Sequence, residues 1–259
     1  MRYILCMKFL ITALLIQSIT LFSFAEEVAH TSNLFELHFF ETSTLTPEQI
    51  KELNNQTISD LESVRIDSRD QIIPNKKSRV TAITPETARV VINSIEQNPV
   101  TKFESYAQYN QPGVDLGFCF GRATFFHLLL LKMGVDKRSI KKVWQIGTMK
   151  AGPITWGYHV ATAVKSTTGE WLILDSVPGK LLNIRDWVDF FAPQNVDHKD
   201  LRVYVSEPAR FGTGPGIYTR ASFGLDYDRE QDWYRHYFLD LMHWFQKTEL
   251  SSLGLSDLR

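Results

Sequence analysis

Cysteine is scarce in this chain of 259 residues, which contains only Cys6 and Cys119. The sequence has no CxxC pair, no HExxH motif and no EF-hand loop, and one cysteine with scattered histidines does not make a zinc site. The glycine-rich segment 212–216 lacks the Gly-Lys-Ser/Thr ending that a phosphate-binding loop requires. We therefore expect no metal ion and no other cofactor.

Neither sign of charge dominates the chain, because its formal net charge is only −1. Composition therefore guarantees no basic face for nucleic acid, and we expect no nucleic-acid partner. With 44% hydrophobic and 22% charged residues, the chain has the composition of an ordinary globular protein with a sizeable core. These figures indicate no particular oligomeric state.

Long hydrophobic runs are also missing, apart from one at the N-terminus. The apolar run from Phe9 to Phe22 follows Arg2 and Lys8, and Ser23-Phe24-Ala25 offers small residues for cleavage. The run is too short for a comfortable membrane span. We predict a signal peptide over residues 1–25, with an uncleaved anchor as the alternative. The mature protein would then be periplasmic or secreted and free of the membrane.

Removal of residues 1–25 would leave Cys119 as the only cysteine. Cysteines of exported proteins usually occur in pairs that form disulfides. A lone thiol there is either a buried apolar filler or a group retained for its chemistry. The residues around Cys119 have to decide between these two interpretations.

The segment 26–105 shows a weaker pattern than the rest of the chain. We predict a strand over 34–40, a helix from the Thr46-Pro47-Glu48 start to about Ser63, and a second helix from Thr84 to about Gln97. The polar stretch 67–78 is typical of an exposed linker or processing site. The whole segment is interpreted as a removable pro-segment, or else as an integral part of the fold or a small accessory domain.

Residues 106–259 form the predicted catalytic domain. A helix over 118–133 is expected to end at Gly134. Antiparallel strands are expected over 141–146, 158–164, 171–174 and 202–205, with a hairpin turn at Thr168-Gly169. A short helix is expected over 183–191, and an aromatic stripe predicts a core-packed helix near residues 234–245. The predicted fold class is α+β.

Cys119 falls at the start of the predicted helix, directly after Gly117-Phe118. Backbone N–H groups at a helix start are unpaired and carry partial positive charge. They would stabilise a thiolate, which is the nucleophilic form of cysteine, and could also bind an oxyanion. The position favours the chemical interpretation of the lone thiol.

A cysteine nucleophile also needs a base, and His159 is the best candidate. His127 lies too far along the same helix to reach Cys119, and we expect it at the helix surface or boundary. His159 opens a β-rich segment, and Asp175 ends the partner strand of the predicted hairpin. The two would lie close together, somewhat offset in register, so that Asp175 could orient the imidazole.

Three motifs together resemble the protein glutaminase family. They are Gly117-Phe118-Cys119-Phe120-Gly121-Arg122-Ala123, Trp156-Gly157-Tyr158-His159-Val160-Ala161, and Leu174-Asp175 followed by Leu182 to Trp187. The resemblance covers about residues 105–192. It implies a papain/transglutaminase-like core in which the catalytic cysteine lies at a helix N-terminus packed on an antiparallel sheet.

The same resemblance implies an activity and a set of site residues. Cys119, His159 and Asp175 would form a triad that deamidates glutamine side chains of proteins or peptides through a thioester. Trp156, Gly117 and Phe118 would line the cleft or bind the oxyanion.

Two alternatives stay open at this point. The same triad could serve a transglutaminase-like acyltransferase or a cysteine peptidase, because the sequence does not show which acceptor reaches the thioester. A binding module on a decayed enzyme fold is the non-enzymatic alternative.

Overall fold

The structure is a computed structural model that describes residues 32–66, 79–110, 117–196, 201–219 and 235–258. The predicted signal peptide and the 67–78 linker lie outside the described residues. Within the described ranges, no helix combines the length and the apolar character needed to cross a membrane.

A five-stranded antiparallel sheet forms the centre of the molecule, with the strand order β4-β3-β2-β1-β5. Its strands are β1 (Ile140–Ala151), β2 (Ile154–Lys165), β3 (Trp171–Leu174), β4 (Leu182–Asn183) and β5 (Arg202–Ser206). The turn at Thr168-Gly169 joins β2 to β3 as predicted, and Gly169 has the positive φ of 91° that favours glycine in such a turn. The structure confirms the predicted α+β class.

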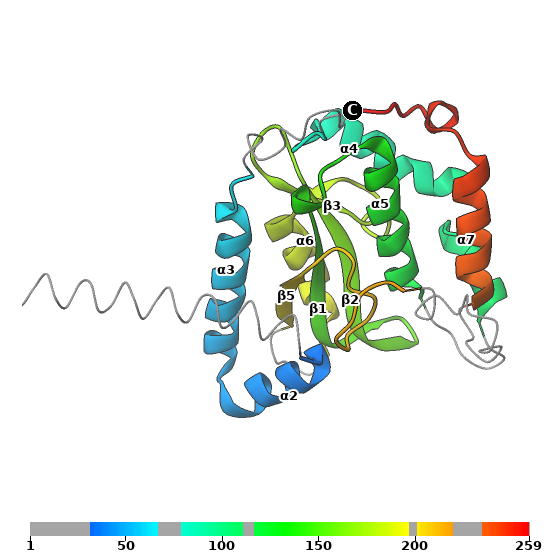
Figure 1. The fold of residues 1–259 in the computed structure, drawn as a ribbon. Coiled ribbons are helices and arrows are strands. Elements are labelled where there is room, and N and C mark those ends of the chain that lie inside the picture. Colours follow the sequence, from blue (N-terminus) through cyan, green and yellow to red (C-terminus); the bar gives the residue numbers. More distant parts are fainter. Residues whose placement is uncertain (1–31, 67–78, 111–116, 197–200, 220–234, 259) are drawn as a thin grey trace, which may run out of the picture.

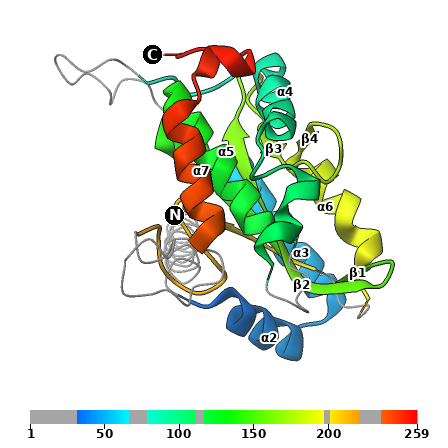
Figure 2. The same cartoon turned by 90° about the vertical axis from the view of Figure 1, so that its right-hand side faces the viewer.

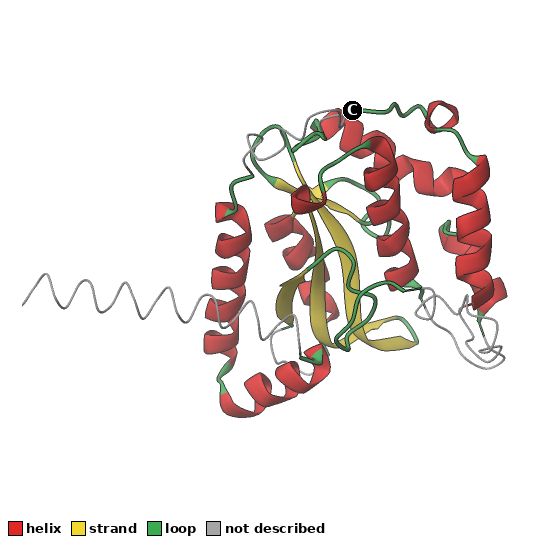
Figure 3. Ribbon diagram, in the orientation of Figure 1, coloured by secondary structure: helices red, strands yellow, loops and turns green. Residues whose placement is uncertain are grey.

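Helices cover both faces of the sheet (Figures 1 and 3). The helices are α2 (Leu34–Thr44), α3 (Pro47–Ser63), α4 (Pro85–Asn93), α5 (Cys119–Met133), α6 (Ile184–Phe191) and α7 (Arg235–Lys247). Short 3₁₀ turns occupy Ser94–Gln97, Phe103–Tyr109, Lys137–Ser139, Ala192–Gln194 and Leu250–Leu253. Turned by 90°, the molecule shows α5 and α7 on one side of the sheet and α3 and α6 on the other (Figure 2).

Strand alternation divides the core into two clusters, one on each face. Trp144 and Val160 face α5, α4 and α7, whereas Val143 and Ala161 face α3 and α6. Successive strand residues point to opposite faces, so both faces of a covered sheet must be apolar. This explains why the central strands are nearly continuously buried instead of alternating between apolar and polar residues.

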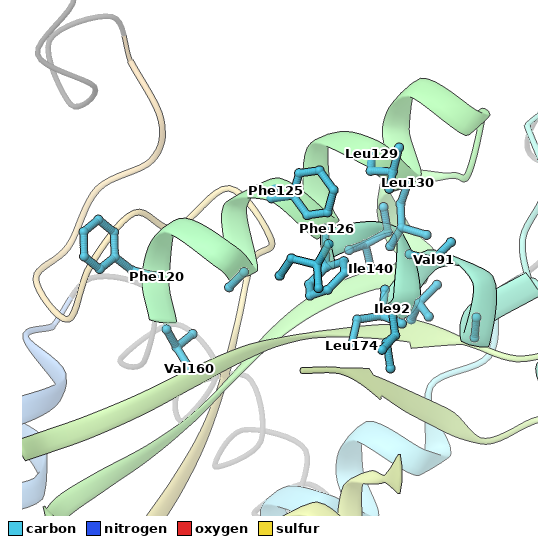
Figure 4. Packing of buried hydrophobic residues seen from close by; sticks show 14 of the residues in the cluster. Val91, Ile92, Phe120, Phe125, Phe126, Leu129, Leu130, Ile140, Val160 and Leu174 are labelled. Atoms are coloured by element: carbon cyan, nitrogen blue, oxygen red, sulfur yellow. The ribbon is translucent and has the colours of Figure 1, made fainter. Parts of the chain in front are cut away.

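Helix α5 lies along the sheet and carries the predicted nucleophile at its first residue. Its own residues Phe125, Phe126 and Leu130 are fully buried. Figure 4 shows Val160 of β2 under the first turn of the helix. Gly134, with φ of 93°, ends the helix as predicted. Hydrogen bonds from Gly134 N–H to the Leu131 carbonyl and from Val135 N–H to the Leu130 carbonyl form a Schellman motif.

The strand predicted over 34–40 is wrong, because the segment forms α2 instead. Asn33 caps its start by accepting a hydrogen bond from Phe35 N–H at 2.9 Å. Leu34 and Leu37, three residues apart, then contact the α5-side core. That spacing suits one face of a helix, and the intervening Phe35 and Glu36 face outward.

The predicted helices α3 and α4 are confirmed, and both begin at their Thr-Pro-Glu starts. α3 packs against the outer edge of β5. There the buried Asn54 side chain donates to the Leu201 carbonyl at 2.6 Å and accepts from Val203 N–H at 2.8 Å. Part of the exposed edge of β5 is therefore paired by this side chain. Whether the N-terminal segment is removed during maturation stays a prediction.

Candidate active site

Cys119 is the first residue of α5 and is half-buried. The preceding residue, Phe118, adopts a left-handed conformation (φ 46°, ψ 28°) and is the one non-glycine residue with positive φ in the described ranges. Such a conformation costs about 1–2 kcal/mol and is held only where packing enforces it. Here the buried Phe118 ring lies between Phe120, at 5.5 Å, and Tyr237, at 4.8 Å. The strained residue Phe118 therefore directly precedes the predicted nucleophile, Cys119.

The start of α5 lacks a side-chain cap. Phe118 occupies the N-cap position but offers no side-chain hydrogen bond to the turn. An uncapped helix start concentrates partial positive charge at its N–H groups. The Cys119 sulfur lies where that charge favours the thiolate.

Cys119, the predicted nucleophile, contacts β2 beside the point where β3 ends. β2 and β3 pair as far as Thr162 and Leu174, so a longer β3 would place Ser176 opposite Val160. Because the β2–β3 ladder ends first, no β3 residue lies opposite Val160, which pairs only with Trp144 of β1. A hydrogen bond from the Val160 backbone to Cys119 helps to lower the pKa of this thiol. Cys119 thereby reaches His159, the neighbour of Val160 on β2.

His159 and Asp175 form a buried hydrogen-bonded pair. His159 Nε2 lies 2.6 Å from Asp175 Oδ2, and both side chains are almost fully buried. With Nε2 directed at the carboxylate, the other ring nitrogen is left for the hydrogen bond to Cys119. Asp175 Oδ1 accepts from Val177 N–H at 3.0 Å, which fixes the carboxylate at the end of β3. The structure thus brings together the three residues selected from the sequence.

Their pKa values move in mutually supporting directions. Burial would lower the pKa of His159, but the negative charge of Asp175, the hydrogen bond to it and the contact with Cys119 raise this pKa to about 9. Burial would likewise raise the pKa of Cys119, but its hydrogen bond to His159, the charge of His159 and the charge of Arg122 bring this pKa below the usual value. For Asp175, the effect of burial is outweighed by His159, so its pKa is lowered. These directions favour a thiolate–imidazolium pair.

Three neighbours of the triad were not assigned from the sequence. Arg122, one turn along α5, is buried and donates to the Gly117 carbonyl at 2.5 Å. Trp187 and Phe191 of α6 stack against the His159 ring at 5.8 Å and 4.5 Å. Trp187 lies within a quoted motif, but a tryptophan on a predicted helix gives no indication of which strand residue it will contact.

The weaker site predictions concern Gly117, Phe118 and Trp156. Gly117 is exposed and immediately precedes Phe118, so both lie at the α5 start. Trp156 is half-buried and packs against the α6-side core. Burial and the charge of Cys119 raise the pKa of Tyr158. Oxyanion roles for Gly117, Phe118 and Trp156 stay predictions.

His127 is not at the helix surface, and that expectation is wrong. It is buried between α5 and the sheet, and its ring lies 5.6 Å from the Tyr218 ring. The same space holds Lys142 of β1, which is fully buried and donates to the Tyr218 hydroxyl at 2.6 Å. Burial and the nearby Lys142 lower the pKa of His127 to about 3. The α5 face of β1 is thus partly polar, which periodicity along α5 alone could not reveal.

Two further features bear on other kinds of site. A cavity of about 290 Å³ is lined by Val64, Arg65, Ile66, Lys137, Arg138, Lys141 and Glu207, and contains none of the predicted site residues. Among the described residues, no group of three or more His, Cys, Asp or Glu side chains is arranged to hold a metal ion.

Comparisons with known proteins give one structural similarity. No protein-family model and no curated protein matches the sequence. The structure is similar to the crystal structure of the A47Q2 mutant of pro-protein-glutaminase, with a TM-score of 0.41 and 16% sequence identity. The alignment covers 60% of this chain and 60% of that one.

Proposed function

We propose that this protein is a cysteine-dependent amidohydrolase that deamidates glutamine side chains in proteins or peptides. The observation that carries the proposal is the buried chain of hydrogen bonds from Cys119 through His159 to Asp175. The glutamine substrate is inferred from the resemblance of the motifs around these residues to protein glutaminases. Amide chemistry suits the arrangement, because a thiolate is a strong nucleophile and an imidazolium can protonate the departing amine.

In the first half of the reaction, the Cys119 thiolate attacks the carbon of the glutamine side-chain amide. The carbonyl oxygen becomes an oxyanion, which backbone N–H groups at the α5 start would stabilise. The C–N bond then breaks, and the His159 imidazolium gives its proton to the nitrogen, which leaves as ammonia. A thioester between Cys119 and the side chain is left.

In the second half, water replaces ammonia. Neutral His159 takes a proton from the water as it attacks the thioester carbon. The C–S bond breaks, the glutamate carboxylate leaves, and the thiolate–imidazolium pair is restored. Asp175 keeps Nε2 of His159 occupied throughout, so that the other ring nitrogen faces the reacting atoms.

The deciding experiment incubates the protein, expressed from residue 26 onward, with a glutamine-rich protein. Ammonia, cross-linked species and cleaved fragments are measured separately. We expect ammonia to be released while the substrate shows neither cross-linked species nor cleaved fragments. Ladders of higher mass would point to acyl transfer, and fragments would point to proteolysis.

Cys119→Ser provides the matched control, because it keeps a hydroxyl of similar size but removes the thiolate. Full activity in this variant would rule out the proposed nucleophile. Absence of all three products with the unaltered protein would instead favour a binding module.

A further inference from the structure

A tryptophan of α6 touches the same carboxylate oxygen as the catalytic histidine. Trp187 Nε1 donates to Asp175 Oδ2 at 2.8 Å, and His159 Nε2 lies 2.6 Å from that oxygen. Asp175 Oδ1 accepts from Val177 N–H. The carboxylate is therefore held by three donors, two of them on the oxygen that faces the imidazole.

The Trp187 side chain is fully buried behind the pair and is itself fixed. Its ring stacks on His159 with an interplanar angle of 28°, and Phe191 packs against it edge-on at 5.4 Å. Gln145, which pairs with His159 across β1 and β2, donates to the Trp187 carbonyl at 3.5 Å. α6 is thus docked beneath the residue that would act as the base.

We propose that Trp187 is a positioning residue that keeps Asp175 ionised and directed at His159. The proposal rests on the function proposed above, and Trp187 would act through Asp175 without touching Cys119 or the substrate. A carboxylate in a dry site stays charged only if donors replace the lost water. Loss of one donor would favour the protonated or rotated carboxyl group, which would weaken the imidazolium and, through it, the Cys119 thiolate.

The competing interpretation is that Trp187 only fills the core, and the chain offers a matched control for it. Trp171 of β3 belongs to the same α6-side cluster and is equally buried. Its indole N–H has no hydrogen-bond partner among the residues that the structure describes. Trp171→Phe therefore removes the same atoms from the same cluster as Trp187→Phe, but no hydrogen bond to Asp175.

The experiment measures the rate of Cys119 alkylation by iodoacetamide between pH 5 and pH 10 in the full chain and both variants. Each rate is divided by the plateau of the same variant at high pH, and urea unfolding reports the stability of each. Trp187→Phe should lower the relative rate at pH 6 by about tenfold, because a hydrogen bond to a charged group is lost. Trp171→Phe should stay within about twofold of the unaltered protein, since it disturbs only packing.

Coincident profiles for the two variants would overturn the proposal. If Trp187→Phe does not fold, 3-benzothienylalanine at position 187 keeps the shape of the indole without its N–H, and the same comparison applies. Alkylation needs no substrate, so a shifted profile without ammonia release would contradict the glutamine substrate and leave the role of Trp187 standing. Ammonia release with an unshifted alkylation profile would support the glutamine substrate and contradict the proposed role of Trp187.

Discussion

His159 and Asp175 lie in contact although they are not opposite each other in the sheet. If the β2–β3 register continued, Asp175 would lie opposite Ala161. His159 lies two residues before Ala161 on β2. The two side chains reach each other diagonally across the strands, and His159 Nε2 lies 2.6 Å from Asp175 Oδ2. Because β3 ends at Leu174, Asp175 is free to turn towards this neighbour.

Asp175→Asn should lower the pKa of His159 and nearly abolish activity. The negative charge of Asp175 is the largest influence that raises this pKa to about 9, and burial alone would lower it. We expect ammonia release to fall on the order of 10⁴-fold, as when asparagine replaces the aspartate of a Ser-His-Asp triad. The imidazole resonances followed by NMR would report the pKa. Asp189→Asn, at an exposed position on α6, is the control and should change neither quantity.

Arg122→Gln should raise the pKa of Cys119 and shift its alkylation to higher pH. The Arg122 charge is one of the influences that lower this pKa, after the hydrogen bond and charge of His159. Arg122→Lys keeps the positive charge but loses the fork that reaches the Gly117 carbonyl. The lysine variant should therefore react more like the unaltered protein than the glutamine variant does. Equal shifts in both would assign the effect to the Gly117 contact instead.

Gly121→Ala should destabilise the fold by about 1–3 kcal/mol, as overpacking of a core does. An added Cβ would lie 2.6 Å from the ring and hydroxyl atoms of Tyr237 on α7. In an open helix the same change would be stabilising, so the sign of the effect in urea unfolding is diagnostic. Gly117→Ala meets no atom within 4 Å and should change stability little. The loss at Gly121 should shrink when Tyr237→Leu is introduced as well; simple additivity would contradict the contact.

His127 should make the protein less stable as the pH falls below about 6.5. Its pKa is about 3 in the folded protein, lowered by burial and Lys142, against 6.5 for an ordinary imidazole. The folded state therefore keeps His127 neutral while the unfolded state binds a proton, and stability is lost progressively between pH 6.5 and pH 3. His127→Gln cannot titrate, so its stability relative to the unaltered protein should improve by up to about 3 kcal/mol between pH 7.5 and pH 4.5.

The measurement is the free energy of unfolding in urea at both pH values. His243→Gln, at an exposed position on α7, is the matched control. A difference between His127→Gln and the unaltered protein that is the same at both pH values would contradict the buried neutral state of His127.

Most elements of the fold could be predicted from local chemistry. The Thr-Pro-Glu starts, the stop at Gly134 and the turn at Thr168-Gly169 depend on hydrogen bonds and backbone angles within a few residues, and all are found. The segment 34–40 was assigned to the wrong class because its helix depends on where Leu34 and Leu37 find a core. A short apolar segment without strong periodicity leaves that choice to its packing.

The sequence alone determined that Cys119 begins a helix and that His159 and Asp175 belong to one hairpin. Those statements follow from chain-local signals and strand pairing, which is why the three residues could be selected together. Only the tertiary structure decided how they meet. β3 ends before it reaches Val160, whose backbone bonds to Cys119, and α6 brings Trp187 onto the Asp175 carboxylate. Such contacts join segments distant in sequence through packing of the whole fold, and no local pattern encodes them.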